Sequence, residues 1–260
     1  MSDGPVGLEH DRGLAVVTFD SPPLNLYDTA LDAGLRGVLA ELEAAEPRAV
    51  LFRAQGRVVS AGVDVSLFAA QEGTDEATGL FDGLVSLTRR VERLECPTVF
   101  AAHALCLTWA FELALGCDLI LAAESASFGL VETVVGLTPA MGGTQRLAER
   151  AGSARAKEFV MTGRPYDAAT MASWGVVNRV LPDDGFDAAA RAFGSELAAG
   201  PTRAHAATKR VIRHYLEGGI DQADAEVGRI AGQLFATADL QNAVRSFLEH
   251  GPGKATFEGR

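Results

Sequence analysis

Two glutamates, Glu112 and Glu132, lie within the most apolar part of this chain. A buried carboxylate loses several kcal/mol of hydration unless it is paired or neutralised. No Lys or Arg occurs between Arg93 and Arg146, so no cation close in sequence can neutralise either acid. Unpaired acids in apolar surroundings have raised pKa values, which suits proton transfer near neutral pH. The alternative is that both carboxylates reach solvent or find partners distant in sequence, and the spacing alone leaves both interpretations open.

Two glycine-containing turns stand out in the sequence. The segment Ser60-Ala-Gly62 follows an apolar run and precedes a helix-like run that begins at Asp64. Backbone N–H groups at such a turn can bind a developing oxyanion, although most glycine turns only connect elements. In the second turn, Gly142-Gly143-Thr144, we expect Thr144 to act as N-cap for a helix over residues 145–150. Neither segment matches a P-loop or a dinucleotide fingerprint.

Apolar runs with strand character alternate with helical patterns along the first two hundred residues. This alternation predicts crossover connections and an α/β layer architecture. Strands are expected at residues 14–19, 49–52, 98–101 and 119–122, and helices at 28–43 and 80–94, with the Glu112 helix between the last two strands.

The strand signal disappears at about Pro201. Residues 202–216, 220–235 and 240–249 read as three helices, with Gly218-Gly219 as a break. We therefore divide the chain into a core, residues 1–200, and a helical C-terminal region, residues 201–260. The apolar faces of the C-terminal helices are expected to be buried within or between subunits, including Ile230, Leu234, Phe235 and Phe247.

Composition narrows the class of protein. The 260 residues carry a formal net charge of −11, which argues against nucleic acid and anionic membrane surfaces as partners. Cys96, Cys106 and Cys117 show no metal-ligand spacing, so no metal site is expected, and an odd count in apolar runs suits a reducing cytosol. No secretory leader or membrane span is predicted, and the expected location is cytoplasmic.

Four segments together resemble the enoyl-CoA hydratase/isomerase (crotonase) superfamily. They are the turn Ser60-Ala-Gly-Val-Asp64, the stretch 103–120 with its Glu-Leu-Ala and Cys-Asp, Phe128-Gly-Leu-Val-Glu132, and the loop and helix at 136–147. The end of the chain, residues 247–260, is also similar, and the match is collinear from about Gly7 to Arg260. The resemblance implies an α/β crotonase-like spiral of repeated ββα/βαβ turns, a C-terminal helical trimerisation region, and a homotrimer or dimer of trimers.

The resemblance also implies a site for an acyl-CoA thioester. The backbone N–H groups of Val63 and Trp109 would hold the thioester oxygen, while Glu112 and Glu132 face the acyl double bond. The expected activity is that of a 2-enoyl-CoA hydratase, a lyase that adds water across C2–C3 and needs no cofactor beyond the CoA of its substrate. A double-bond isomerase and a low-turnover acyl-CoA-binding protein are the alternatives. The implied substrate-binding residues are Ala61, Gly62, Asp64, Val65, Ala140 and Lys254.

Three departures from the family pattern bear on this assignment. Thr108-Trp109-Ala110 stands where the family usually has Gly-Gly-Gly, and we expect the Trp109 indole to narrow the acyl site, with packing in the core as the alternative. Val65 is followed by Ser66 rather than by a lysine for CoA phosphate. Pro22-Pro23 replaces a basic residue, so the phosphates need other cations, with Arg57 or Lys254 as candidates.

Three other polar or aromatic residues have structural interpretations. We expect His103 to be a hydrogen-bonding residue at a strand end and Trp174 to be a packing residue. The motif around Ser60 is not Gly-x-Ser-x-Gly, so a role in the turn is favoured over a nucleophile.

Overall fold

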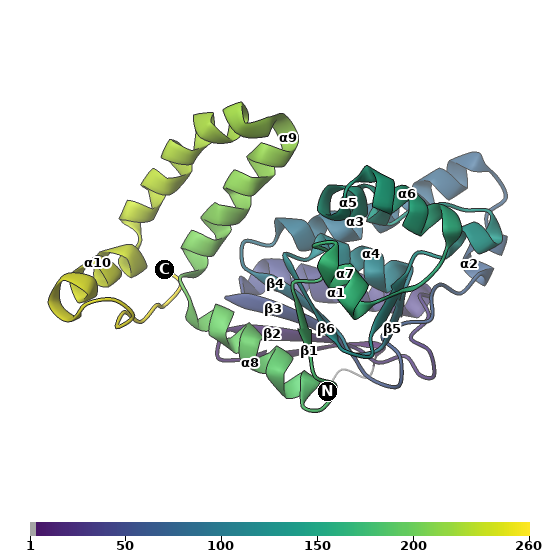
Figure 1. The fold of residues 1–260 in the computed structure, drawn as a ribbon, viewed down its shortest axis with the longest axis horizontal. Helices are drawn as coiled ribbons and strands as arrows, with labels where there is room; N and C mark the ends of the chain where they lie inside the picture. The colour runs from purple at the N-terminus through teal and green to yellow at the C-terminus, as the bar shows by residue number, and fades with distance from the viewer. Residues whose placement is uncertain (1–3) are drawn as a thin grey trace.

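In the computed structural model, which describes residues 4–260, two sheets and their covering helices form a core, from which a helical arm projects (Figure 1). The larger sheet has the order β1-β2-β3-β4-β6-β9, and the smaller has the order β5-β7-β8. β1 is antiparallel to β2, and every other pair in the larger sheet is parallel. The predicted α/β alternation is confirmed.

The strands are short and the helices vary widely in length. The strands are β1 Val6–Asp11, β2 Leu14–Phe19, β3 Ala49–Ala54, β4 Thr98–Ala102, β5 Leu105–Leu107, β6 Leu119–Ala123, β7 Ser127–Gly129, β8 Tyr166–Asp167 and β9 Arg179–Leu181. The helices are α1 Thr29–Ala45, α2 Ser66–Ala69, α3 Thr74–Arg93, α4 Trp109–Gly116, η1 Glu132–Val135, α5 Gly143–Ala151, α6 Ser153–Thr162, α7 Ala168–Ser173, α8 Phe186–Ala199, α9 Thr202–Gln233, η2 Leu234–Ala236 and α10 Ala238–His250.

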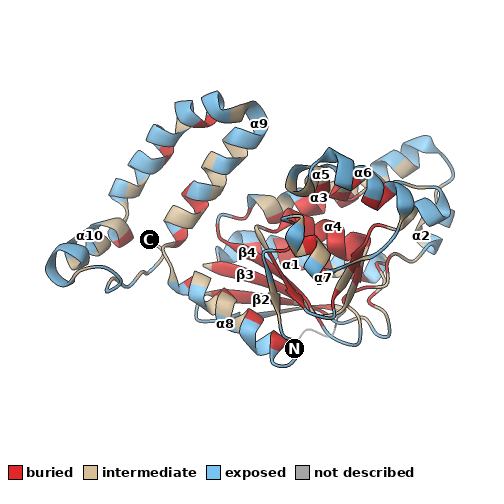
Figure 2. Cartoon of the chain, viewed as in Figure 1, coloured by how far each residue is buried: buried red, intermediate tan, exposed pale blue. Residues whose placement is uncertain are grey.

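The central parallel strands are covered on both faces, which explains their continuous apolar sequences. All of β4 is buried, as are five of the six residues in β2 and in β3. Helices α3, α4, α5 and α6 lie on one side of the larger sheet and α8 on the other (Figures 1 and 2). The parallel strands end on the same edge, so the loops that follow them gather there.

Helix α4 is the most enclosed helix, since all eight of its residues are buried. It packs against α3 at Gly116, where a Cβ would lie only 2.4 Å from Thr88 Cγ2. Only glycine permits this approach. The carboxylate of Glu112 is therefore carried into the core by a helix that has no solvent-exposed face.

The turn at residues 60–64 is attached to two other segments by isolated bridges. Ser60 pairs with Cys106 in β5, and Val63 pairs with Tyr27 ahead of α1. The N–H of Leu107 donates to Ser60 O at 3.1 Å, and the N–H of Val59 donates to Leu105 O at 2.9 Å. These bonds place the turn beside β5, immediately before the start of α4.

The helical C-terminal region extends away from the sheets (Figure 1). Within α9 the backbone leaves helical geometry at Gly218 and Gly219, which confirms the predicted break. The residues before and after these two glycines are helical. Lys209 joins α9 to the core through an ion pair with Asp118 at 2.8 Å. Arg48 donates to Gly200 O and Phe257 O, both at 2.9 Å, and so holds both ends of the arm.

The predicted elements match the observed ones to within a few residues, except that α3 begins at Thr74 rather than at residue 80. One predicted cap is wrong. The N-cap of α5 is Gly142 rather than Thr144, and Gly143 is the first helical residue. The N–H of Gly143 is directed to Glu112 instead of to a capping side chain. Within residues 4–260, no helix is both long and apolar enough to cross a membrane.

Candidate active site

The Glu112 carboxylate is held by two backbone donors from the loop that precedes α5. Its Oε2 accepts hydrogen bonds from Met141 N–H at 2.8 Å and Gly143 N–H at 2.7 Å. A Cβ on residue 143 would lie 2.6 Å from Glu112 Cγ, so the contact requires glycine. Thr88 supports the loop by donating to Met141 O at 2.8 Å. One carboxylate oxygen is thus fixed, and the other is left for a ligand.

Burial is the main reason that Glu112 holds its proton. The residue is 3% exposed, and burial raises its pKa to about 8. The negative charge of Glu132 adds to this rise, whereas the two backbone donors and the more distant Arg146 oppose it. Arg146 is itself paired with Glu92 at 2.5 Å. Among the described residues no cation forms an ion pair with Glu112, which agrees with the sequence.

Glu132 approaches the same region from the short helix η1. Its Oε2 is buried and has no hydrogen-bond partner among the described residues. Burial raises the pKa of Glu132 to about 7, opposed by a hydrogen bond from its own backbone. Because the charge of Glu132 raises the pKa of Glu112, the protonation of one carboxylate affects that of the other.

The hydrogen bonds of the turn at residues 60–64 leave one N–H available. Ala61 N–H donates to Leu24 O at 2.9 Å and Asp64 N–H donates to Tyr27 O at 2.9 Å. Gly62 N–H donates to Ser60 Oγ at 3.0 Å. Within the described part of the chain no acceptor is found for Val63 N–H. Val63 is therefore the residue of this turn that can bind an oxyanion through its backbone.

Trp109 is the first residue of α4, so its N–H has no preceding helical carbonyl to bond. The neighbouring Thr108 N–H donates to Gly129 O at 2.9 Å. Gly62 lies against Thr108, since a Cβ on Gly62 would be 3.5 Å from Thr108 Oγ1. The free N–H groups of Val63 and Trp109 thus belong to two segments that pack against each other, at the positive end of the α4 dipole.

The indole of Trp109 lies in the core, so the expectation that it narrows the acyl site is wrong. Trp109 is 2% exposed and packs edge-on against Phe19, with ring centroids 5.0 Å apart, and against Tyr27 at 5.5 Å. Its Nε1–H donates to Ser60 Oγ at 2.7 Å and to Asn25 O at 3.2 Å. The indole therefore ties α4 to the turn that carries Val63.

The other structural interpretations agree with these contacts. Ser60 Oγ donates to Asn25 O at 2.8 Å and accepts from Gly62 N–H, so Ser60 is a turn residue. His103 Nε2 lies 2.9 Å from Gly56 O. Trp174 packs against Tyr166, with ring centroids 4.9 Å apart, and beneath Arg155.

The expected substrate-binding residues divide into two groups. Ala61, Gly62, Asp64 and Val65 flank Val63 in sequence, and Ala140 precedes the Met141 donor to Glu112. Lys254 lies in the segment after α10, and this segment is on the opposite side of the molecule from α2 and the turn (Figure 1). Within one chain Lys254 is therefore not brought to the glutamates.

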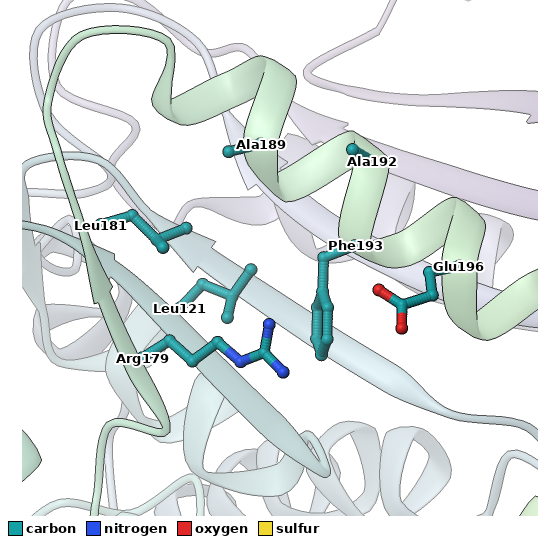
Figure 3. A pocket seen from close by; sticks show the side chains of 7 residues that line it. All are labelled: Leu121, Arg179, Leu181, Ala189, Ala192, Phe193 and Glu196. Carbon is teal, nitrogen blue, oxygen red and sulfur yellow. The ribbon is translucent and has the colours of Figure 1, made fainter.

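A hollow of about 310 Å³ lies between α8 and the strands β6 and β9 (Figure 3). It is lined by Leu121, Arg179, Leu181, Ala189, Ala192, Phe193 and Glu196. The Arg179 guanidinium covers the Phe193 ring at 4.3 Å. Neither glutamate lines this hollow, and α8 covers the face of the sheet opposite α4. Residues 4–260 contain no cluster of His, Cys, Asp or Glu that could hold a metal ion.

The sequence indicated the residues that face the site but did not indicate those that support it. Met141, Gly143 and Thr88 position Glu112, and Asn25 anchors the Ser60 turn. The glycine pair at 142–143 was a usable signal, because adjacent glycines at a helix start permit a close approach. Asn25 carried no such signal.

Comparisons with known proteins show the family and the fold. The sequence profile of the family described as "Enoyl-CoA hydratase/isomerase" matches residues 9–260. A "Probable enoyl-CoA hydratase" of Rhodobacter capsulatus is 33% identical, with 100% of each chain covered. The "Short-chain-enoyl-CoA hydratase" of Clostridium acetobutylicum is 29% identical over 93% of this chain and 94% of its own. The crystal structure of an enoyl-CoA hydratase from Bacillus anthracis superposes with a TM-score of 0.90, at 25% identity over 98% of this chain and 100% of that one. The predicted fold is confirmed.

The packing of Trp109 predicts a stability effect without a change in ligand preference. Trp109→Ala should lower the free energy of unfolding by about 3–5 kcal/mol, as for other buried aromatic truncations. Trp109→Phe keeps the ring contacts but removes the Nε1–H donor, so its loss should be about 1 kcal/mol. Urea denaturation measures both. Near-normal stability of Trp109→Ala would show that the indole is not part of the core.

The raised pKa values predict that stability falls as pH rises. Both glutamates have an ordinary pKa of 4.5, raised to about 8 for Glu112 and about 7 for Glu132 in the folded protein. The folded state therefore binds their protons more tightly, and this stabilisation is complete below pH 4.5 and lost as pH rises through the folded pKa values. Glu112→Gln should flatten the decline in the free energy of unfolding between pH 5 and 9. Parallel pH curves for wild type and variant would contradict the raised pKa of Glu112.

Proposed function

We propose that this protein, which belongs to the enoyl-CoA hydratase/isomerase (crotonase) family, adds water across the C2–C3 double bond of a 2-enoyl-CoA thioester. The observation that carries the proposal is the interacting pair of buried Glu112 and partly buried Glu132, on the helices α4 and η1, near two free backbone N–H groups. Water addition needs a base and an acid on one substrate, together with a donor for the carbonyl oxygen. Each of these groups has a counterpart here.

The oxyanion donors act on the thioester carbonyl. Addition of water at C3 moves electrons through C2 towards the carbonyl oxygen, which then carries negative charge. The N–H groups of Val63 and Trp109 bind that oxygen, and the α4 dipole adds to the stabilisation. Because both donors are backbone groups fixed by neighbouring hydrogen bonds, they need little reorganisation during the reaction.

The glutamate pair carries the protons. With one proton on the pair, the ionised carboxylate takes a proton from water while the water oxygen forms its bond to C3. The protonated carboxyl gives its proton to C2, so the pair ends the cycle again with one proton. We assign water activation to Glu112, whose fixed Oε2 leaves Oε1 for water, and proton transfer at C2 to Glu132, whose Oε2 is unpartnered. Because Glu112 has the higher pKa, the shared proton rests mainly on Glu112, and the reacting form is reached when that proton moves to Glu132.

A double-bond isomerase is the second candidate. Isomerisation moves a proton between two carbons and can use one carboxylate as the shuttle. Glu132 has the freer carboxylate, which suits that role. The presence and firm attachment of Glu112 favour hydration. An acyl-CoA-binding protein with little turnover is the third candidate, since no lysine follows Val65 and Lys254 lies in the segment after α10.

The mechanism predicts that both acids are needed for hydration. Glu112→Gln and Glu132→Gln should each lower kcat by roughly 10²–10⁴-fold, the range for loss of a general acid or base. The measurement is the loss of enoyl absorbance with crotonyl-CoA, followed by identification of the 3-hydroxyacyl product.

Affinity for a saturated acyl-CoA is the control, because it has no double bond and should bind both variants nearly as tightly as wild type. The isomerase would be favoured if only Glu132→Gln loses activity and the wild-type protein forms a product with a shifted double bond. Unchanged kcat in either variant removes that residue from the mechanism.

We also propose that the C-terminal region forms a trimer or a dimer of trimers. Ile230 is buried within the chain, whereas Phe235 is 68% exposed and Phe247 is 59% exposed. Burying such side chains between subunits is favourable by roughly 25 cal/mol per Å². A second copy of the chain is also the means by which Lys254 could reach a CoA phosphate.

Light scattering tests the assembly. We expect the mass of a trimer or hexamer at micromolar concentration, and Phe247→Glu should shift the distribution towards smaller species. Asn242→Glu, at an exposed position on the same helix, adds the same single negative charge and is the matched control. A monomeric wild-type protein would contradict the trimer and leave the fold unaffected.

A further inference from the structure

Thr108 carries two unfavourable features at one residue. Its backbone has φ 48° and ψ −119°, a conformation that a β-branched residue rarely adopts. Its Oγ1 is buried and has no hydrogen-bond partner among residues 4–260, and the residue is 6% exposed. Both the strained backbone and the buried hydroxyl without a partner destabilise the folded chain.

The normal role of a threonine at this position is not fulfilled. Thr108 is the N-cap residue of α4, where a hydroxyl ordinarily accepts from an N–H of the first turn. Here the side chain makes no capping bond. It lies instead against Gly62, where a Cβ would be 3.5 Å from Oγ1 and 3.7 Å from Cγ2. The hydroxyl is therefore located where the turn of Val63 meets the start of α4.

We propose that the Thr108 hydroxyl is a third donor to the thioester oxygen, beside the N–H groups of Val63 and Trp109. The inference rests on the proposed function and adds a side-chain donor to it. A thioester oxygen only accepts hydrogen bonds, and a hydroxyl can donate one, so the ligand would satisfy Oγ1. Thr108 adjoins both backbone donors, one through Gly62 and the other through its own peptide link to Trp109.

Removing the hydroxyl without changing the shape of the side chain tests this role. Thr108→Val should lower kcat with crotonyl-CoA by roughly 10²-fold, as for loss of one oxyanion donor. Thr108→Ser keeps the donor and should retain most of the activity. Thr208→Val makes the same chemical change on the exposed surface of α9 and is the matched control. Equal kcat for wild type and Thr108→Val would overturn the proposal.

A spectroscopic measurement separates a donor from a packing residue. The absorbance of a conjugated aryl-enoyl-CoA moves to longer wavelength as its carbonyl is polarised. We expect this shift on binding to wild type and Thr108→Ser, and a smaller shift on binding to Thr108→Val. Equal shifts in wild type and Thr108→Val would overturn the role of Thr108 and leave the hydratase proposal in place. Absence of acyl-CoA binding by wild type would overturn both.

Thr108→Gly gives an independent readout. Glycine adopts positive φ without strain, so this variant should unfold at a higher temperature than wild type while losing kcat as Thr108→Val does. A purely structural threonine would not separate stability from turnover in this way. Retained kcat in Thr108→Gly would contradict the donor role.

Discussion

The two hydrogen bonds from Met141 and Gly143 to Glu112 are the interaction on which the rest of the site depends. They hold a carboxylate inside a helix with no exposed residue, where an ion would otherwise be prohibitively costly. The glycine at 143 is required by this contact, and the close packing of α3 on α4 at Gly116 encloses it. The neighbouring charge of Glu132 then opposes full ionisation of the pair. Burial and a like charge together keep a proton at the site near neutral pH, against the opposing effect of the two backbone donors.

The oxyanion donors depend on a second set of contacts, which centres on Ser60. Ser60 Oγ accepts from the Trp109 indole and from Gly62 N–H, and it donates to Asn25 O. The start of α4 and the turn of Val63 are thereby joined through one hydroxyl. Since α4 also carries Glu112, the same helix sets the position of a catalytic acid and of an oxyanion donor. A change in the packing of α4 would move both.

The sequence was informative where chemistry leaves a compositional trace. Glu112 and Glu132 were recognisable as acids in apolar runs without a nearby cation, and the glycine turn at residues 60–62 marked the Val63 donor. The sequence was uninformative where the contacts of a residue are made with partners distant in sequence. The indole of Trp109 packs against Phe19 and Tyr27 from the first thirty residues, which neither its sequence neighbours nor its helical position indicate. Thr144 was predicted as N-cap because its residue type favours that position. The helix begins one residue earlier, at Gly143, whose N–H donates to Glu112.

The central claim is that Glu112 and Glu132 together hold a proton at neutral pH, and infrared difference spectroscopy tests it most directly. The carbonyl band of a protonated carboxyl group is compared between wild type and the double variant Glu112→Gln/Glu132→Gln across a pH series. We predict a band at pH 6 that is absent in the double variant and disappears as pH rises through about 7 and 8. Loss of the band by about pH 5, as for ordinary glutamates, would contradict the account.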